Sequence, residues 1–380
     1  MSARSPFLNE EHAAFRRTVR RFVEREISPH IDAWEAAEAF PRELYAKAGA
    51  IGLLGIGFQE ELGGVATDAF YEQIATEELA RAGSGGVIAG LMSHGIALPP
   101  IVALGSDELK QRLVPPVLAG QHIAALAVTE PGGGSDVASL RTTAVRDGDD
   151  WVVNGDKTFI TSGMRADLIT TAVRTGGPGL EGISILAIEG DTPGLSRRSL
   201  EKMGWWCSDT AHLHFEDCRV PGINLVGAEN MGFYGLMANF SHERLMLAAM
   251  AWAFSRVCLD DAVDWAEQRQ TFGRPLIARQ VIRHKLVEMR SRIDAVGAWL
   301  ERLTWQLEQG EEAIAEVCML KNLATATLEH CAGEAVQILG GMGYMRGTRV
   351  ERIFRETKVL SIGGGASEIL ADLAARQLGW

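Results

Sequence analysis

The stretch that most constrains the fold of this chain is residues 126–163, which read LAVTEPGGGSD, then a short strand-like run, then WVVNGDKTFITSG. Residues 131–135 are Pro-Gly-Gly-Gly-Ser, a loop with almost no Cβ atoms, so its backbone amides can approach a planar or anionic ligand closely. Asn154-Gly155 predicts a tight hairpin between two apolar runs. The strand ends and the loop would then face one space, and their hydroxyls and single aromatic plane suit a flat heteroaromatic cofactor. The side chains concerned are Thr129, Ser135, Phe159 and Thr161.

The three glycines alone are compatible with other structures. On their own, three glycines are equally consistent with a surface turn. A P-loop is excluded because no Gly-Lys-Ser/Thr follows them. A Rossmann fingerprint is disfavoured because Ser135-Asp136 leads into alternating residues rather than into a helix. The cofactor interpretation therefore depends on the glycine loop and the hairpin signal occurring together.

The composition narrows the class of protein. A chain of 380 residues with 47% hydrophobic and 23% charged residues suffices for two or three packed layers. Its net charge of −12 argues against binding to nucleic acid or to an anionic membrane. The five cysteines are scattered without CxxC spacing, which favours reduced thiols in a cytoplasmic protein and disfavours a metal site. No secretory signal and no membrane-spanning segment is expected, because no apolar run is long enough.

The period of the hydrophobic pattern divides the chain into three parts. Residues 1–120 repeat apolar side chains at helical spacing, with Ser106 as a predicted N-cap. Residues 121–228 alternate with a period of two between Gly, Pro and Asp clusters, which predicts an antiparallel β domain. Residues 229–380 carry long amphipathic stripes, which predict a domain resembling a four-helix bundle. Long helices are expected over 245–267, 280–308 and 314–339. The predicted fold class is therefore α+β.

Six separated motifs, in this order, resemble those of the acyl-CoA dehydrogenase family. They are Thr129-Glu130-Pro131 through Gly134-Ser135-Asp136, Lys157-Thr158-Phe159-Ile160-Thr161, Ser208-Asp209-Thr210, Arg269-Gln270-Thr271-Phe272-Gly273, Gln337-Ile338-Leu339-Gly340-Gly341 with Gly343-Tyr344, and Ile362-Gly363-Gly364-Gly365-Ala366-Ser367-Glu368. Each motif is weak alone, but together they cover essentially the whole chain. The resemblance implies an FAD enzyme of fatty acid or branched-chain acyl catabolism. Such an enzyme converts a saturated acyl-CoA to a trans-2-enoyl-CoA and passes the electrons to an electron-transfer flavoprotein.

The resemblance also implies which residues bind FAD. The middle β domain would contribute Leu126, Val128, Thr129, Gly134, Ser135, Phe159 and Thr161, with the Thr161 hydroxyl near flavin N5. The C-terminal domain would contribute Arg269, Thr271, Phe272, Gln280, Gln337, Gly340, Gly341, Ala366 and Glu368, several of them to the FAD of a neighbouring subunit. A shared site implies a homo-oligomer, commonly a dimer of dimers. The glycines at 340 and 341 are equally compatible with a helix C-cap, and Glu368 with a structural role behind Ser367 as an N-cap.

The implied reaction needs a carboxylate that takes the α-proton of the thioester. In many family members this glutamate lies in the C-terminal motif, where this chain has Gly364. Glu243 matches the glutamate that the isovaleryl and long-chain branches use instead. Its helix neighbours three and four positions away include no cation, which favours a raised pKa: Asn239, Phe240, Met246 and Leu247. The alternative is a structural glutamate near a helix start, stabilised by the helix dipole.

The remaining implied roles concern the substrate. The N–H of Gly364 would hydrogen-bond the thioester oxygen together with a flavin ribityl hydroxyl. Substrate contacts are implied for Ser135, Ser241, Arg244, Gly364 and Gly365. Arg244 either orients Glu243 or reaches the CoA end of the substrate.

Two positions depart from the family pattern. Ala366 replaces a usual threonine, and Trp206 replaces a usual arginine. Trp205-Trp206 is interpreted as a hydrophobic plug in preference to a wall of the substrate site. Two alternatives to the dehydrogenase remain: a flavin monooxygenase or other oxidase on the same fold, and a non-enzymatic or nucleic-acid-associated relative, which the negative net charge disfavours.

Overall fold

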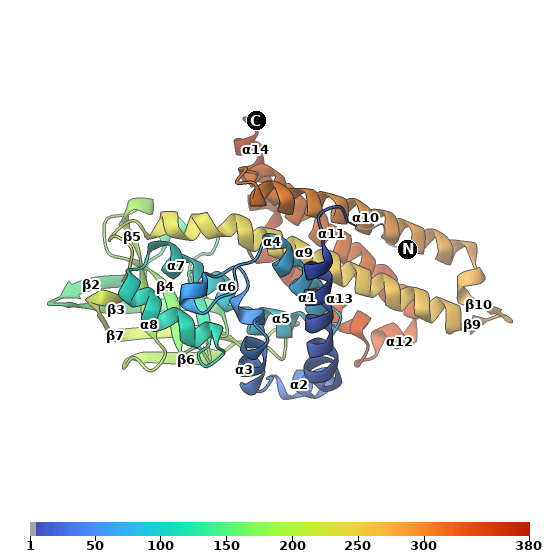
Figure 1. The fold of residues 1–380 in the computed structure, drawn as a ribbon, viewed down its shortest axis with the longest axis horizontal. Helices are drawn as coiled ribbons and strands as arrows, with labels where there is room; N and C mark the ends of the chain where they lie inside the picture. Colours follow the sequence, from blue (N-terminus) through green and yellow to red (C-terminus); the bar gives the residue numbers. More distant parts are fainter. Residues whose placement is uncertain (1–4) are drawn as a thin grey trace. The chain divides into compact units, whose positions relative to one another are not determined.

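The computed structural model describes residues 5–380, apart from the side chains of residues 238 and 239. The chain forms two compact units, which we call the helical unit and the sheet unit. The helical unit comprises Met1–Ala33, Thr67–Gly85 and Ser241–Trp380, and the sheet unit comprises Trp34–Ala66 and Gly86–Phe240. Each unit is described by itself. The three-part architecture expected from the sequence, helical, then β, then helical, is confirmed in the order of the elements (Figure 1).

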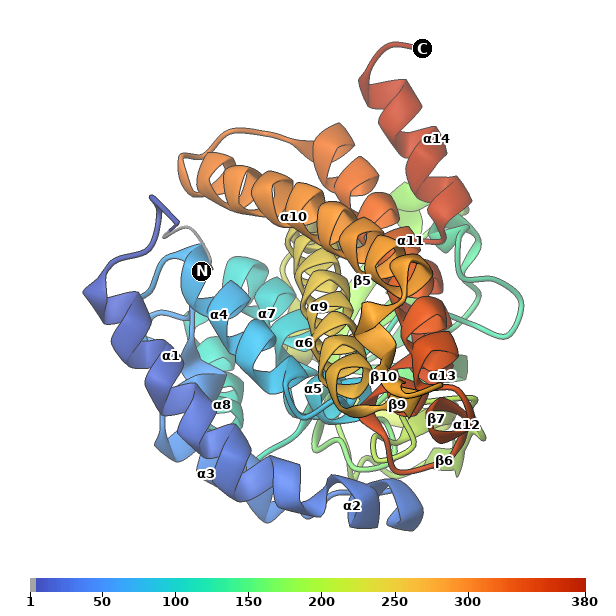
Figure 2. The same cartoon turned by 90° about the vertical axis from the view of Figure 1, so that its right-hand side faces the viewer.

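The helical unit is built on long helices whose apolar faces pack together. Its helices are α1 (Glu10–Phe22), α4 (Ala69–Ala80), α10 (Gln280–Glu308), α11 (Ile314–Leu339), α12 (Gly341–Tyr344), α13 (Arg349–Ile362) and α14 (Ser367–Gln377), with a small hairpin of β9 (Gln270–Thr271) and β10 (Arg274–Pro275). A π-helical turn, Val23–Ile27, continues α1. Helices α2 (Ile31–Ala37), α5 (Gly85–Leu91) and α9 (Gly232–Gln268) contribute residues to both units. Helices α10 and α11 run side by side in both views (Figures 1 and 2).

The predicted spans of α10 and α11 are confirmed at both ends, whereas α9 begins at Gly232 and not near residue 245. Two glycines in its first turns disfavour a helix by propensity, so the sequence pattern does not predict these turns. A Cβ on Gly232 would lie 2.6 Å from the carbonyl carbon of Ser184, and one on Gly235 would collide with Leu104. Both positions therefore require glycine for close packing, although glycine disfavours a helix.

The sheet unit contains a mixed sheet in the order β6-β7-β3-β2-β4-β5-β8, with β1 paired to β4. The strands are β1 (Ala124–Ala127), β2 (Thr143–Asp147), β3 (Asp150–Thr161), β4 (Leu168–Arg174), β5 (Ile183–Glu189), β6 (Leu195–Ser199), β7 (Thr210–Pro221) and β8 (Leu225–Val226). Its helices are α3 (Glu43–Ala50), α6 (His94–Ala97), α7 (Pro99–Leu104) and α8 (Asp107–Leu118). Ser106 caps α8 as predicted, since its hydroxyl accepts the Leu109 N–H at 3.2 Å. The sheet is not wholly antiparallel as expected, because β1 runs parallel to β4.

The hairpin expected at Asn154-Gly155 is wrong. The turn that joins β2 to β3 lies at Gly148, whose φ is +65°, and Asp147 pairs with Asp150 across it. Asn154 and Gly155 instead lie inside β3, at a break in its register with β7. A Cβ on Gly155 would lie 2.7 Å from the Cα of Thr142. The dipeptide therefore makes a β-bulge, which bends the strand before it reaches residues 157–161.

Strands β4 and β5 are buried on both faces, which explains their nearly continuous apolar sequence. Leu168 and Ile183 pack with helices α7 and α8 in one cluster. Ile169 and Leu186 point to the other face and pack with Trp151 and neighbouring side chains of β3 and β7. Among the described residues no single helix is long and apolar enough to cross a bilayer, although the bent pair Gly85–Leu91 and His94–Leu104 meets the criteria of length and composition.

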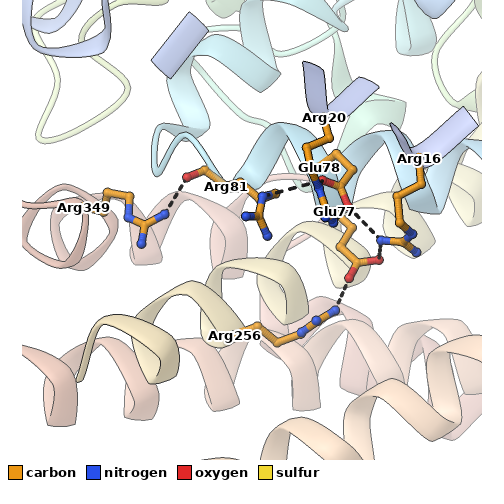
Figure 3. A network of polar contacts seen from close by, with 7 residues as sticks. All are labelled: Arg16, Arg20, Glu77, Glu78, Arg81, Arg256 and Arg349. Atoms are coloured by element: carbon orange, nitrogen blue, oxygen red, sulfur yellow. Dashed lines mark hydrogen bonds and ion pairs between the residues drawn. The ribbon is translucent and has the colours of Figure 1, made fainter. Parts of the chain in front are cut away.

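A network of charges joins α1, α4 and α9 within the helical unit (Figure 3). Glu78 is only 1% exposed and accepts hydrogen bonds from Arg16 at 2.9 Å and from Arg20 at 2.8 Å. Arg16 also donates to Glu77, which pairs in turn with Arg256. Burial raises the pKa of Glu78, but the hydrogen bonds from Arg20 and Arg16 outweigh it, so the pKa lies below its ordinary value. The carboxylate is thus ionised in the folded chain.

We expect Glu78→Gln to destabilise the folded state at pH 7 by about 3 kcal/mol, since it leaves buried arginines without their anion. The pKa of Glu78 is depressed by folding, so its contribution is present above the ordinary glutamate pKa of about 4.3 and disappears as the pH falls through the folded value. The measurement is guanidinium unfolding of both proteins from pH 7 to pH 3. The exposed Glu312→Gln serves as the control. A wild-type advantage that persists unchanged at pH 3 would contradict this account.

Candidate active site

In the sheet unit, a buried lysine fastens the glycine loop to β3. Lys157 is fully buried, and its Nζ donates to the carbonyl of Val128 at 3.0 Å and to Glu130 at 2.8 Å. The Thr158 N–H donates to the Thr129 carbonyl at 2.8 Å. Burial lowers the pKa of Lys157 to about 8, although Glu130 opposes the shift. The segment from Val128 to Glu130 is therefore fixed to β3 through the carbonyls of Val128 and Thr129 and through the carboxylate of Glu130.

Glu130 itself closes the base of the loop through hydrogen bonds to the backbone. Its two carboxylate oxygens accept the backbone N–H groups of Arg141 at 2.6 Å and Thr142 at 2.8 Å. Burial raises the pKa of Glu130, but the charge of Lys157 and these hydrogen bonds lower it overall. Such a satisfied buried ion pair fixes backbone geometry, whatever its net effect on stability.

The loop and strand end form an exposed edge with unusual backbone geometry. Phe159 has φ +60° and is 69% exposed, at the second break in the pairing of β3 with β7. A bulky side chain in this conformation carries strain of about 1–3 kcal/mol, which is typical of ligand sites. Gly134 lies against Thr129, since a Cβ on Gly134 would be 3.2 Å from Thr129 Cγ2. Ser135 is exposed, and Leu126, Val128, Thr129 and Thr161 are half-buried.

These residues fit a flavin. The exposed ring of Phe159 and the hydroxyl of Thr161 lie on β3, and Thr129, with Gly134 against it, lies on the segment hydrogen-bonded to that strand. The geometry supplies a surface for stacking and donors for a polar ring edge. The structure thus brings Val128, Thr129, Gly134 and the 157–159 segment together.

In the helical unit, Glu243 lies beside the glycines that connect α13 to α14. Gly364 has φ +66°, where only glycine is unstrained. A Cβ built on Gly364 would lie 3.6 Å from Glu243 Oε1 and 2.5 Å from Leu247 Cδ1. The carboxylate of Glu243 therefore lies within van der Waals contact of the position that a Cβ on residue 364 would take.

Glu243 is a half-buried carboxylate without a bonded partner. Among the residues that the structure describes, it makes no hydrogen bond and no ion pair. Burial raises its pKa, while the charges of Arg244, Lys321 and His242 act in the opposite direction. The pKa of Glu243 is therefore raised as expected, and desolvation is the cause. Of the four helix neighbours named above, the side chain of Asn239 lies outside the described part of the structure. The alternative of a glutamate held by the helix dipole is excluded, because α9 begins about three turns earlier.

The groups around Glu243 are largely engaged elsewhere. His242 pairs with Glu72 at 2.6 Å, which raises the pKa of the histidine against the effect of burial. Arg244 is 9% exposed and its Nε donates to the Gly364 carbonyl at 3.1 Å. Ser241, on the same helix, is half-buried. Arg244 therefore contacts the glycine loop, and whether it also orients Glu243 or reaches the CoA end of the substrate stays a prediction.

The other expected FAD residues of the helical unit lie at one end of α10 and α11. The ion pair of Lys285 with Glu334 places the start of α10 beside the last turns of α11. Phe272 is 97% exposed with φ +49° in the β9–β10 hairpin. Further exposed or half-buried residues at this end are Arg269, Thr271, Gln280, Gln337, Gly340 and Gly341. Gly340 ends α11 with φ +60°, so the expected C-cap is confirmed.

Three further expectations concern α14 and the tryptophans. Ala366, and not Ser367, is the N-cap of α14, so the predicted cap is wrong, and Glu368 is exposed in its first turn. In the sheet unit a Cβ on Gly86 would lie 3.1 Å from Trp205 Cα. Trp206 Nε1 donates to the Lys202 carbonyl at 2.9 Å. Both tryptophans are half-buried, and their interpretation as a hydrophobic plug stays a prediction.

Lys321 is the residue near Glu243 that sequence reasoning missed. It is fully buried in α11 and its Nζ donates to the Gly365 carbonyl at 2.7 Å. The available signal was a single lysine within the apolar stripe of residues 314–339. A charge at such a position needs a partner, and sequence alone does not name it.

Comparison with known proteins identifies three matching domains. The family models described as acyl-CoA dehydrogenase N-terminal, middle and C-terminal domain match residues 9–121, 125–218 and 230–379. The chain is 37% identical over 374 residues to the mitochondrial long-chain specific acyl-CoA dehydrogenase of Sus scrofa, covering 97% of this chain and 87% of that protein. It is 49% identical to a protein of known structure from Mycobacterium smegmatis, with a TM-score of 0.97 and 99% of each chain covered. It is 38% identical to the acyl-CoA dehydrogenase of Geobacillus kaustophilus, with a TM-score of 0.96, covering 99% of this chain and 100% of that one.

We expect Lys157→Met to lower the free energy of unfolding by about 3 kcal/mol, because Glu130 stays buried without its cation. The loosened loop should also retain FAD about tenfold more weakly. Urea unfolding and the release of flavin fluorescence on dialysis measure the two effects. Lys110→Met, on the surface of α8, is the control. Normal flavin retention in the Lys157 variant would show that the lysine does not shape the cofactor loop.

Proposed function

Since the chain belongs to the acyl-CoA dehydrogenase family and is an enzyme of that kind, we propose that it oxidises a saturated acyl-CoA to a trans-2-enoyl-CoA, with FAD as cofactor and an electron-transfer flavoprotein as acceptor. The carrying observation is the approach of Glu243 Oε1 to within 3.6 Å of the Cβ position of Gly364. This contact supports a base on helix α9 in a chain whose loop has glycine in place of the usual acid. Its freedom from ion pairs among the described residues suits a proton acceptor.

The chain's own groups would act on the thioester as follows. Glu243 accepts the α-proton on a carboxylate oxygen, which becomes a carboxylic acid. The Gly364 N–H donates to the thioester oxygen and stabilises the negative charge that develops there. Burial keeps the pKa of Glu243 above its ordinary value, which makes the carboxylate a stronger base at neutral pH. The β-hydrogen leaves with its electron pair, and the Cα–Cβ double bond forms.

FAD, when bound, supplies the acceptor for that hydride. In the sheet unit, Phe159 would stack on the ring system and Thr129, Ser135 and Thr161 would supply hydroxyls, with Leu126, Val128 and Gly134 beside them. The exposed side chain of Phe159 and its strained backbone support this assignment. In the helical unit, the residues that we propose for FAD binding are Arg269, Thr271, Phe272, Gln280, Gln337, Gly340, Gly341, Ala366 and Glu368. The residues that we propose for substrate contacts are Ser135 in the sheet unit and Ser241, Arg244, Gly364 and Gly365 in the helical unit.

We also propose a homo-oligomer, with two dimers forming a tetramer, in the cytoplasm. Support comes from the end of α10 and α11, where Phe272 is 97% exposed and Tyr344 is 80% exposed. Aromatic side chains left in solvent on a rigid hairpin and helix cap are suited to contact a second copy of the chain. A site completed by a neighbouring subunit would cover them.

The reaction itself is tested by anaerobic mixing of the FAD-loaded protein with a panel of acyl-CoAs. We expect loss of the visible absorbance of oxidised flavin with thioesters of the preferred chain, followed by reoxidation through a dye or an electron-transfer flavoprotein. A monooxygenase would instead need a reduced nicotinamide for bleaching and oxygen for turnover. Bleaching by nicotinamide alone, with no response to any thioester, would overturn the proposal.

We expect Glu243→Gln to slow flavin reduction on the order of 10²-fold or more while FAD stays bound. Because only the ionised carboxylate accepts a proton and its pKa is raised, the wild-type rate should fall on the acid side at a pH above the ordinary glutamate pKa of about 4.3. Stopped-flow reduction from pH 5 to pH 9 measures both effects. Glu229→Gln, an exposed acid before α9, is the control. Near-normal reduction by the Glu243 variant would reject it as the base.

A further inference from the structure

The backbone of the loop that carries Gly364 is not held in one conformation by its own residues. Gly364 and Gly365 have φ +66° and +109°, conformations that glycine reaches freely but does not hold by itself. An N–H that stabilises charge on a substrate must be aimed before the substrate arrives, since reorganisation costs rate. Among the described residues the Gly364 N–H donates to no acceptor. It is thus available, and its direction must come from its neighbours.

Two cations hold the carbonyls that follow this N–H. Arg244, on α9, donates through Nε to the Gly364 carbonyl at 3.1 Å. Lys321, on α11, donates through Nζ to the Gly365 carbonyl at 2.7 Å. On the preceding side, the Gly363 N–H donates to the Val359 carbonyl at 2.7 Å and ends α13. The peptide that bears the Gly364 N–H is therefore fixed from both directions.

The position of Lys321 is costly and is not explained by an ion pair. Its side chain is 0% exposed, and among the described residues it makes no ion pair with a carboxylate. The charged or titratable groups that act on it are Glu243, Arg244 and Cys318, and burial lowers its pKa to about 8. A buried ammonium beside a second cation lowers the stability of the fold unless hydrogen bonds compensate for its lost hydration. The Gly365 carbonyl is its backbone partner.

We propose that Lys321 is a positioning residue of the reaction: together with Arg244 it holds the Gly364-Gly365 carbonyls and thereby aims the Gly364 N–H at the oxygen of a bound thioester. This inference rests on the proposed dehydrogenation. Lys321 does not touch the substrate in this account. It acts through the loop, and its charge also opposes the rise in the pKa of Glu243.

The test uses the FAD-loaded enzyme and an acyl-CoA in which sulfur replaces the β-methylene. This analogue can lose its α-proton to the enzyme but cannot transfer a hydride, so its bound anion is observed as a long-wavelength charge-transfer band with oxidised flavin. Titrating the band with pH gives the apparent pKa of the bound α-proton. That quantity reports stabilisation of the thioester anion, which a merely structural lysine would not alter.

We expect Lys321→Met to raise this apparent pKa by about one unit or more, a roughly tenfold weaker α-acidity, with flavin content and far-UV circular dichroism retained. Lys321→Gln, which keeps an N–H donor without the charge, should show a smaller shift. Lys358→Met, the same change on the exposed face of α13, is the matched control and should leave the titration unchanged. If Lys321→Met does not fold, Lys321→Gln decides by the direction of its shift.

The inference is overturned if a folded, flavin-bound Lys321 variant titrates as the wild type does. Failure of the proposed function looks different: the wild-type enzyme would then give neither the charge-transfer band nor bleaching by a substrate thioester. Loss of the band in Glu243→Gln together with an unshifted Lys321 variant would keep the base and remove only the positioning role.

Discussion

A buried ammonium group has to find hydrogen-bond acceptors inside the protein, because the loss of its hydration costs several kcal/mol. The chain uses this constraint in both of its units. Lys157 takes the Val128 carbonyl and Glu130 as acceptors, and Lys321 takes the Gly365 carbonyl. Each acceptor lies in a loop whose glycines leave the backbone free. The backbone geometry of both loops therefore depends on charges that the solvent does not screen.

The glycine at position 364 and the acid at position 243 form a second dependence. Because Gly364 adopts a left-handed conformation and faces Leu247 and Glu243 closely, a side chain there would be strained and would collide. Placing the acid on α9 removes that conflict. A helix in its interior also holds a side chain more rigidly than a glycine loop does, which favours a constant distance between base and substrate. The loop is then left to present its backbone N–H alone.

The sequence was sufficient to predict the long helices with a periodic apolar pattern and the candidate residues that lie in motifs. It did not predict contacts between residues that are distant in sequence. The ends of α10 and α11 followed from their apolar stripes, but the first turns of α9 did not, because Gly232 and Gly235 are required by packing against distant residues. Asn154-Gly155 has the chemistry of a hairpin turn, yet tertiary pairing with β7 makes it a bulge. Glu243 was predicted as the base from its motif and from the absence of an acid at position 364. The partner of Lys321 lies 44 residues away in sequence, where no local pattern reaches.

The two buried lysines differ in a way that separates fold from function. Lys157 has an acid within 2.8 Å, and that acid is itself saturated by backbone N–H groups, so the charges balance locally. Lys321 has a carbonyl and a neighbouring arginine, while the acid that acts on it, Glu243, makes no ion pair among the described residues. A direct ion pair between Lys321 and Glu243 would neutralise both buried charges. It would also lower the pKa of the Glu243 carboxylate and make it a weaker base. The arrangement instead keeps the two apart and directs the lysine to the backbone. Local stability is lower in consequence, and the carboxylate remains available for a proton, as expected where a site and a stable core make opposite demands.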